Sequence, residues 1–383
     1  MYIQHLKLRN WRNFKTVDID LRERVFLVGP NACGKSNLLD VFRFLRDIAA
    51  RDGGGLHRAV SERGGITKIR CLYARRYPTI EIEIHLGEDF TADPKWKYAI
   101  GIKQKKGGDN PVILDYERVW KENQLILDRP DDDDKKDDDL LTQTALEQLK
   151  SNAEFRDIQN FLRSTLYLHL VPQLLRYPDA FESANVQADP FGRNFLERVV
   201  KTTDRTRKSR LKKIEEVLKI AVPQIKELKD IKDEMGRPHL ESVYEHWRPN
   251  AGKQREDQFS DGTLRLIALF WSLLEANGSL LLLEEPELSL NSGIVTKLPA
   301  LIARLQKDKK SQVILSTHSS EILSDEGIDG REVVVMNPTK EGTSVKVANS
   351  IQEIHNLLES GLTVADTVLP YIRPSIDQLE LFQ

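Results

Sequence analysis

Cysteine and long apolar runs are scarce in this chain of 383 residues. Cys33 and Cys71 are its only cysteines, so a disulfide framework is excluded, and the pair lacks metal-ligand spacing. No stretch reaches the roughly 18 consecutive apolar residues that a transmembrane helix needs. The opening residues lack the charged-then-apolar layout of a signal peptide. We therefore expect a reduced, cytoplasmic protein with no membrane partner.

Charge is nearly balanced over the whole chain but unevenly distributed. The net charge is −2, yet residues 131–139 hold seven Asp and two Lys. A block of like charges repels itself and stays solvated, so we predict a flexible acidic loop there. Residues 201–213 hold seven basic residues against the single acid Asp204. That segment fits phosphate binding and, equally well, a solvated helical face.

Hydrophobic patterns divide the chain into strand-rich and helical parts. Alternation predicts a pair of strands around a turn at 10–15, a buried strand at 24–28 and a helix at 36–49. An antiparallel β lobe is expected from strands at 69–73, 79–86, 97–103 and 112–120. Helical patterns cover 140–175 and 207–231, interrupted by Pro223. Helices at 263–276 and 294–306 alternate with strands at 279–283, 312–315 and 332–336, which predicts a largely parallel, buried sheet.

A glycine-rich loop follows the strand expected at 24–28. Its residues, Gly29-Pro30-Asn31-Ala32-Cys33-Gly34-Lys35-Ser36, satisfy the pattern of a phosphate-binding loop. Glycines let backbone N–H groups approach phosphate oxygens, and the following helix directs its positive end to the same anion. Lys35 would bridge the β- and γ-phosphates, and Ser36 would ligate Mg²⁺. The alternative is a chance match in a glycine turn, which the strand before it and the amphipathic helix after it disfavour.

Two carboxylates end a run of four leucines, Leu280 to Leu283. They belong to Glu284 and Glu285, and ligands bind at the carboxyl ends of strands in open α/β sheets. One carboxylate can hold the Mg²⁺ shell while the other orients the attacking water. The alternative is a solvated acidic turn after a core strand.

Two weaker features lie on either side of this strand. Ser260-Asp261-Gly262 precedes a helix, where it forms an ordinary N-cap turn or offers a hydroxyl and N–H groups to a γ-phosphate. His318 follows the strand expected at 312–315, where a single histidine is more often structural than catalytic. Its interest lies in its position after the other three motifs.

The order of these motifs is that of ABC-type ATPases, and their details resemble the SMC/RecF/OLD branch. Residues 6–14 resemble its NFRNF element, and residues 29–40 resemble its GPNGSGKSNLLDA loop. Residues 284–290 and 316–319 resemble its DEPExxLHP and TTHS blocks. The pattern is closest to the predicted AAA-type ATPase family related to OLD and RecF. Residues 90–250 match nothing in that branch.

The resemblance implies a fold, cofactors and roles. The fold is an α/β head of ABC/SMC type with a mainly parallel sheet. Residues 1–139 would form its N-terminal half with the β lobe, 140–250 a helical insertion and 251–383 its C-terminal half. ATP and Mg²⁺ are the implied cofactors. Nucleotide would be bound by Gly29, Asn31, Ala32, Cys33, Gly34, Lys35, Ser36 and Asn37, and the metal by Ser36 and Glu284. Lys35, Glu285 and His318 would act in hydrolysis.

The same resemblance implies a dimer. Ser260 and Gly262 would contact the γ-phosphate of ATP bound to a second subunit, so that two heads sandwich the nucleotide. Asn291 falls near the dimer-contact loop of the family. Arg12 and Asn13 are expected to approach the nucleotide.

Several residues depart from the family pattern. Ala32 replaces a glycine, so its backbone geometry must tolerate a Cβ. Cys33 replaces serine and provides either an oxidisable thiol or passive packing. Glu284 replaces the commoner Asp, which lengthens the arm to Mg²⁺ by one methylene. Residues 61–66, where a Q-loop glutamine is expected, hold none. Hydrolysis is therefore expected to be slow or partner-dependent.

Three functions remain open at this point. The first is an ATP-driven, DNA-associated dimeric switch that controls a separate effector, such as a nuclease, in DNA repair or anti-phage defence. The second is a RecF-like repair loader, and the third is a nucleotide-binding scaffold or antitoxin-like regulator with negligible turnover. No acidic metal constellation of the Toprim type follows His318, so the chain itself is not expected to cut DNA.

Overall fold

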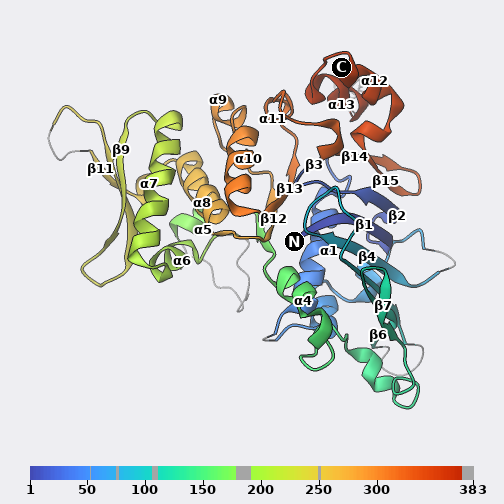
Figure 1. Cartoon of the computed structure of the whole chain (residues 1–383). Coiled ribbons are helices and arrows are strands. Elements are labelled where there is room, and N and C mark those ends of the chain that lie inside the picture. Colours follow the sequence, from blue (N-terminus) through green and yellow to red (C-terminus); the bar gives the residue numbers. More distant parts are fainter. Residues whose placement is uncertain (52, 75–76, 106–110, 178–190, 249–251, 373–383) are drawn as a thin grey trace, which may run out of the picture. The chain divides into compact units, whose positions relative to one another are not determined.

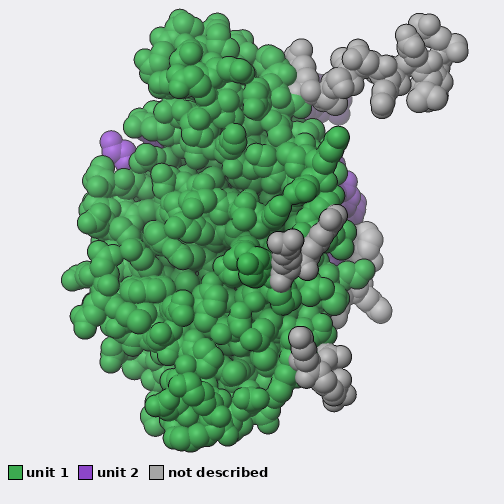
Figure 2. Space-filling model, turned by 90° about the vertical axis from the view of Figure 1, so that its right-hand side faces the viewer, with its two compact units in different colours: residues 1–165, 278–282, 311–383 green, residues 166–277, 283–310 purple. Residues whose placement is uncertain are grey.

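The chain forms two compact units. The computed structural model describes residues 1–51, 53–74, 77–105, 111–177, 191–248 and 252–372. Unit 1 comprises residues 1–165, 278–282 and 311–383, and unit 2 comprises residues 166–277 and 283–310. Figure 2 colours unit 1 green and unit 2 purple. Unit 2 is thus built from two insertions into unit 1. The division of the chain at residues 139 and 250 remains a prediction.

An antiparallel sheet forms the β lobe of unit 1 (Figure 1). Its strand order is β2-β1-β4-β5-β6-β7, and the alternating burial of its strands places one face against the core. The strands are β1 (Tyr2–Trp11), β2 (Phe14–Asp20), β4 (Ile80–Gly87), β5 (Trp96–Gln104), β6 (Val112–Lys121) and β7 (Gln124–Arg129). Pairing of Trp11 with Phe14 closes the tight turn that holds Arg12 and Asn13.

A mainly parallel sheet carries the phosphate loop. In unit 1 its order is β15-β14-β3-β13-β12, and β12 continues into unit 2, where β8 follows it in the order. The strands are β3 (Arg24–Val28), β8 (Leu166–Leu168), β12 (Leu280–Glu284), β13 (Gln312–Thr317), β14 (Val333–Thr339) and β15 (Gly342–Val347). Strands β13 and β14 run parallel to β3, and β15 is antiparallel to β14. All five residues of β3 are buried, as expected for a central strand.

Helix α1 follows the phosphate loop and packs its apolar face inward. It spans Lys35–Ala49 and buries Leu38, Leu39, Val41, Phe42, Leu45 and Ile48, a helical spacing that keeps these side chains on one side. The other helices of unit 1 are α2 (Leu56–Ser61), α3 (Ile66–Ile69), α4 (Arg156–Arg163), α11 (Ser320–Leu323), α12 (Gln352–Glu359) and α13 (Val364–Ile372).

Unit 2 combines helices with a small antiparallel sheet. Its helices are α5 (Pro172–Arg176), α6 (Phe195–Lys201), α7 (Asp204–Ala221), α8 (Asp261–Glu275), α9 (Ser292–Val295) and α10 (Leu298–Lys309). Its sheet has the order β11-β10-β9, formed by β9 (Ile225–Lys232), β10 (Pro238–Tyr244) and β11 (Lys253–Arg255). Trp271 of α8 is fully buried and makes an edge-on contact with Phe195.

The predicted α/β class is confirmed, and three local predictions are wrong. Residues 69–73 form no extended strand, because α3 runs to Ile69 and only Arg70 then pairs, in an isolated antiparallel bridge, with Trp11 at the end of β1. The helix predicted over 207–231 stops at Ala221, since proline at 223 cannot donate to a helical carbonyl. The chain then forms β9, so the insertion is not purely helical.

The acidic segment 131–139 is not simply a solvated loop. Asp134 is 2% exposed and pairs with the Arg129 guanidinium at 2.6 Å. Arg129 also lies 3.4 Å from the fully buried Glu117. The segment is therefore anchored to β6 and β7, because a buried arginine needs carboxylates to compensate its charge.

None of the helices among the described residues combines the length and the apolar run needed to cross a bilayer.

Candidate nucleotide site

The phosphate loop joins β3 to α1 by a backbone path that requires its glycines. Gly34 caps α1 at φ 101°, and no side chain caps the helix. A Cβ on Gly29 would lie 2.3 Å from the carbonyl oxygen of Met336, and one on Gly34 would lie 2.3 Å from the Asn13 amide. The N-terminus of α1, with its partial positive charge, therefore lies directly at the end of the loop, as in anion sites at helix N-termini.

Lys35 and Ser36 supply the polar side chains of the loop. Lys35 is buried, and its Nζ donates to the carbonyl oxygens of Gly29 at 2.9 Å and Pro30 at 3.2 Å. Ser36 is exposed on the first turn of α1. Among the described residues no group of three His, Cys, Asp or Glu could hold a metal ion. Mg²⁺ takes oxygen ligands and commonly shares them with nucleotide phosphates, so the exposed Ser36 hydroxyl beside the buried Lys35 fits Mg-ATP.

Asn13 holds the loop from the β1–β2 turn. Its Nδ2 donates to the Cys33 carbonyl oxygen and to Thr343 Oγ1, both at 2.8 Å. Its Oδ1 accepts from Asn37 Nδ2 at 2.8 Å. Thr343 Oγ1 also donates to the Cys33 carbonyl oxygen at 2.8 Å. The structure therefore gives Asn13 a loop-bracing position next to the predicted nucleotide site.

Arg12 forms an ion pair with Asp40 of α1. Its Nη2 lies 2.7 Å from Asp40, and Arg63 Nη2 lies 3.0 Å from the same carboxylate. Burial alone raises the pKa of Asp40, but Arg63, Arg43 and Arg12 together outweigh that effect, so the pKa is lowered. Arg63 belongs to the segment 61–66 in which no Q-loop glutamine occurs. Here that segment supplies an ion pair behind the phosphate loop.

Ala32 and Cys33 take up different environments. Ala32 is exposed at φ 62°, in the left-handed region that a Cβ disfavours. Cys33 is 1% exposed, and burial raises the pKa of its thiol against the opposing effect of Lys35. A reactive cysteine is exposed and has a lowered pKa, so Cys33 has the features of a packing residue.

His318 lies at the same sheet edge as the phosphate loop. The parallel register pairs Thr317, the last residue of β13, with Val28, the last residue of β3. His318 and Gly29 therefore each come directly after the end of one of two neighbouring strands. His318 is exposed. The structure therefore brings together, in unit 1, the phosphate loop and the histidine that the sequence placed 282 positions after Ser36.

The remaining predicted residues belong to unit 2. Ser260 is exposed and caps α8, since its Oγ accepts from Thr263 N at 3.2 Å. A Cβ on Gly262 would lie 2.5 Å from the Ser289 carbonyl oxygen. Asn291 caps α9 by accepting from Gly293 N at 2.9 Å. The segment Ser260-Asp261-Gly262 thus packs closely against the loop that follows Glu284 and Glu285.

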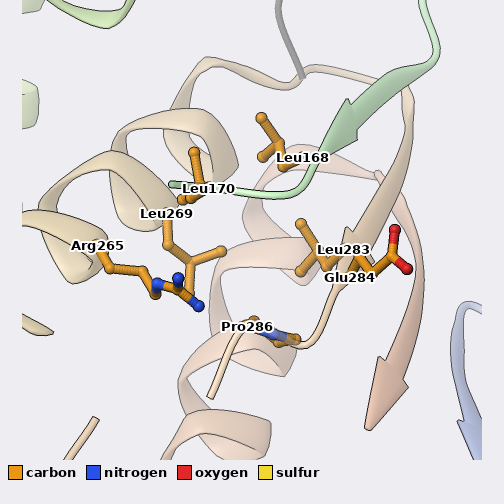
Figure 3. A pocket seen from close by; sticks show the side chains of 7 residues that line it. All are labelled: Leu168, Leu170, Arg265, Leu269, Leu283, Glu284 and Pro286. Atoms are coloured by element: carbon orange, nitrogen blue, oxygen red, sulfur yellow. The ribbon is translucent and has the colours of Figure 1, made fainter. Parts of the chain in front are cut away.

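Glu284 and Glu285 end β12 in different conformations. Glu284 is the last strand residue, and Glu285 has φ 44°, a strained value that for a non-glycine residue is often found at functional sites. Arg265 of α8 donates to the Glu285 carbonyl oxygen at 3.4 Å, and its burial lowers the pKa of its guanidinium. Figure 3 shows Arg265 across a small apolar cavity from Glu284, whose carboxylate points away from it.

Sequence reasoning missed three residues of these sites. Tyr167 donates its phenol hydrogen to Glu284 Oε2, Thr343 braces the phosphate loop, and Arg265 contacts the backbone at Glu285. Arg265 lies five residues after Ser260 in the same helix, which is a usable local signal. Tyr167 and Thr343 have none, because they lie 117 and 310 residues from their partners.

Comparison with known proteins agrees with this geometry. Residues 24–324 match the family described as "AAA domain, putative AbiEii toxin, Type IV TA system". The chain is similar to the DNA replication and repair protein RecF of Picosynechococcus sp., at 31% identity over 87 residues, 22% of each chain. It is also similar to RecF of Lactobacillus gasseri, at 31% over 110 residues, 28% of each. The aligned segments thus cover only a minor part of the RecF chains.

Solved structures with the same fold include SMC heads. An SMC head bound to the C-winged helix domain of ScpA has a TM-score of 0.54 at 15% identity, covering 90% of this chain and 98% of that one. An SMC head with an extended coiled coil from Pyrococcus furiosus has a TM-score of 0.51 at 13% identity, covering 94% and 99%. At such identities the likeness shows the fold alone. The family match, which spans most of the chain, shows that this chain belongs to the AAA-domain family named above, and its fold is that of an SMC head.

Proposed function

We propose that this chain binds and hydrolyses ATP with Mg²⁺ and forms a homodimer around the nucleotide. The dimer would couple this cycle to DNA sensing or to control of a separate effector in DNA repair or anti-phage defence. The observation that carries the proposal is the register of Thr317 with Val28. His318 follows Thr317 at the sheet edge where the phosphate loop begins, and ligands bind at such edges, which supports a role for His318 in sensing the γ-phosphate.

The proposed roles follow from the chemistry of each side chain. Lys35 and the first-turn N–H groups of α1 would hold the phosphates, with Lys35 leaving its two loop carbonyls to do so. Ser36 and Glu284 would hold Mg²⁺, which when bound neutralises phosphate charge. Glu285 would accept a proton from the attacking water, and His318 would sense the γ-phosphate.

The proposed dimer uses the exposed start of α8. Ser260 is on the surface, and the N-terminus of α8 directs partial positive charge outward. This arrangement supports contact with a γ-phosphate held by a second copy of the chain.

The proposed DNA contact uses cations of α7. Arg205, Lys208, Lys212 and Lys213 are exposed. Burial lowers the pKa of Lys309, and Arg210 and Lys213 lower it further. Cations that lie close together repel one another, and binding of a polyanion relieves that repulsion. This supports nucleic acid as the ligand.

ATP turnover of the wild type and of Glu285→Gln, with and without double-stranded DNA, tests the proposal. Loss of a comparable catalytic group lowers kcat on the order of 10²–10³-fold, and nucleotide binding should persist. Glu287→Gln, two residues further along, is the matched control and should retain turnover. Unchanged turnover in Glu285→Gln would remove its catalytic role.

Other outcomes identify the competing functions. Nucleotide binding without turnover in either condition would favour the scaffold or antitoxin-like regulator. Binding restricted to gapped or junction DNA would favour a RecF-like loader. Ser260→Arg should abolish ATP-induced dimerisation in sedimentation, and a dimer that persists would exclude the sandwich.

A further inference from the structure

Glu284, the proposed Mg²⁺ ligand, is held by a residue far away in the sequence. Tyr167 of β8 is 8% exposed, and its hydroxyl donates to Glu284 Oε2. The Glu284 side chain is 14% exposed. Both residues belong to unit 2, so this hydrogen bond lies within one compact body.

The surroundings of Tyr167 keep its ring in place. Side chains alternate along β8, so Leu168 lies on the opposite side of the strand from Tyr167, and Leu170 follows two residues later. Those leucines line the apolar cavity with Leu269 and Leu283. Figure 3 shows them grouped beside α8, with the Glu284 carboxylate directed away from them. A shift of β8 would expose these leucines, so the phenol is anchored by burial.

A hydrogen-bonded carboxylate is a better-oriented metal ligand than a mobile one. Glutamate has one more rotatable bond than aspartate, the commoner residue at this position of the motif. The phenol occupies one of about four lone-pair sites of the carboxylate and restrains its torsions. The remaining sites then keep a constant direction, which is how hydrogen-bonded neighbours raise metal affinity.

We propose that Tyr167 is the positioning residue for Glu284, orienting its carboxylate toward Mg²⁺. The inference rests on the proposed function, because it takes Glu284 as the metal ligand. Removal of such a partner typically lowers metal affinity about 10–100-fold. Tyr167→Phe should therefore weaken Mg²⁺ binding while it retains the ring and its packing.

Equilibrium binding of ATPγS to the full chain distinguishes loss of Mg²⁺ binding from loss of nucleotide binding. Calorimetry measures it in EDTA and over a Mg²⁺ titration. Tyr167→Phe should raise the half-saturating Mg²⁺ concentration about 10–100-fold and leave the dissociation constant in EDTA unchanged. Tyr98→Phe is the matched control: its phenol also donates to a buried carboxylate, Glu117, at 3.0 Å, but in the β lobe. It should retain the wild-type Mg²⁺ dependence.

A double mutant tests whether Tyr167 acts through Glu284. Glu284→Gln alone should raise the half-saturating Mg²⁺ concentration. Adding Tyr167→Phe to it should have no further effect, because the effects of two coupled residues are not additive. Three results would each overturn the inference while leaving the ATPase proposal intact. They are additive losses of Mg²⁺ affinity in the double mutant, an unchanged Mg²⁺ requirement in Tyr167→Phe, and an equal loss of ATPγS affinity in EDTA. A wild type that does not bind ATPγS would overturn the proposed function and this inference with it. Binding of ATPγS that does not depend on Mg²⁺ would overturn the metal role of Glu284 and this inference, but not nucleotide binding.

Discussion

The side-chain amide of Asn13 donates to the Cys33 carbonyl oxygen at 2.8 Å and so joins the β1–β2 turn to the phosphate loop. The same Cys33 oxygen accepts from Thr343 of β15. Two distant segments thus converge on one carbonyl of the loop. These hydrogen bonds fix the orientation of the peptide plane between Cys33 and Gly34. They thereby fix the direction of the Gly34 N–H, which would meet a phosphate.

Asn13→Ala is expected to weaken ATP binding roughly tenfold, since it removes hydrogen bonds each contributing about 0.5–1.5 kcal/mol. Titration of ATPγS by calorimetry measures the effect. Asn123→Ala, in the exposed β6–β7 turn, is the control. Equal affinities for Asn13→Ala and the wild type would show that the loop keeps its shape without this brace.

Ala32→Gly is expected to stabilise the protein, because a left-handed backbone costs a non-glycine residue about 1–2 kcal/mol. The gain appears as a higher urea midpoint. Ala50→Gly, at a position with φ −67°, should instead lower the midpoint, because glycine there only adds entropy to the unfolded chain. A lower midpoint for Ala32→Gly would contradict strain at position 32.

Asp40→Asn is expected to destabilise the protein at neutral pH by roughly 1.5–3 kcal/mol, because it weakens the charged hydrogen bonds of the partly exposed Arg12 and of the buried Arg63, which keeps Asp47 as a partner. The folded pKa of Asp40 is lowered. Its contribution is therefore complete above the unfolded value of about 3.9 and is lost as pH falls through the folded pKa.

The difference in unfolding free energy between wild type and Asp40→Asn should accordingly shrink below about pH 3.9. Urea unfolding at several pH values measures it. Asp132→Asn, at an exposed ion pair, should change stability little at any of them. A pH-independent difference for Asp40→Asn would contradict an ionised Asp40.

Cys33 and Cys71 should resist thiol reagents in the native protein. Both are buried, and the raised pKa of Cys33 keeps its thiol protonated near neutral pH. Ellman's reagent at pH 8 should release thionitrobenzoate only after urea is added. Rapid release from the native chain, lost in Cys33→Ser, would instead favour an oxidisable loop thiol.

Local sequence predicted much of the fold. Strand β3, the phosphate loop and α1 were predicted near their observed bounds, because an apolar run, glycines and a helical repeat act between near neighbours. The prediction failed at 69–73, where α3 runs to Ile69 and only Arg70 pairs, with Trp11 at the end of β1. It also failed at Asp134, whose partner Arg129 withdraws it from water. In the first place a contact between distant segments outweighed local preference, and in the second a buried arginine five residues away did.

The sequence by itself determined that a glycine-lysine-serine loop follows a strand, that Glu284 and Glu285 end another strand and that His318 follows a third. Only the tertiary structure decided which residues support them. Asn13 and Thr343 meet at the Cys33 carbonyl, and Tyr167 meets Glu284 across 117 residues of chain. The physical reason is that strand order and register, which depend on burial of the whole sheet, set these distances, and no local pattern encodes them.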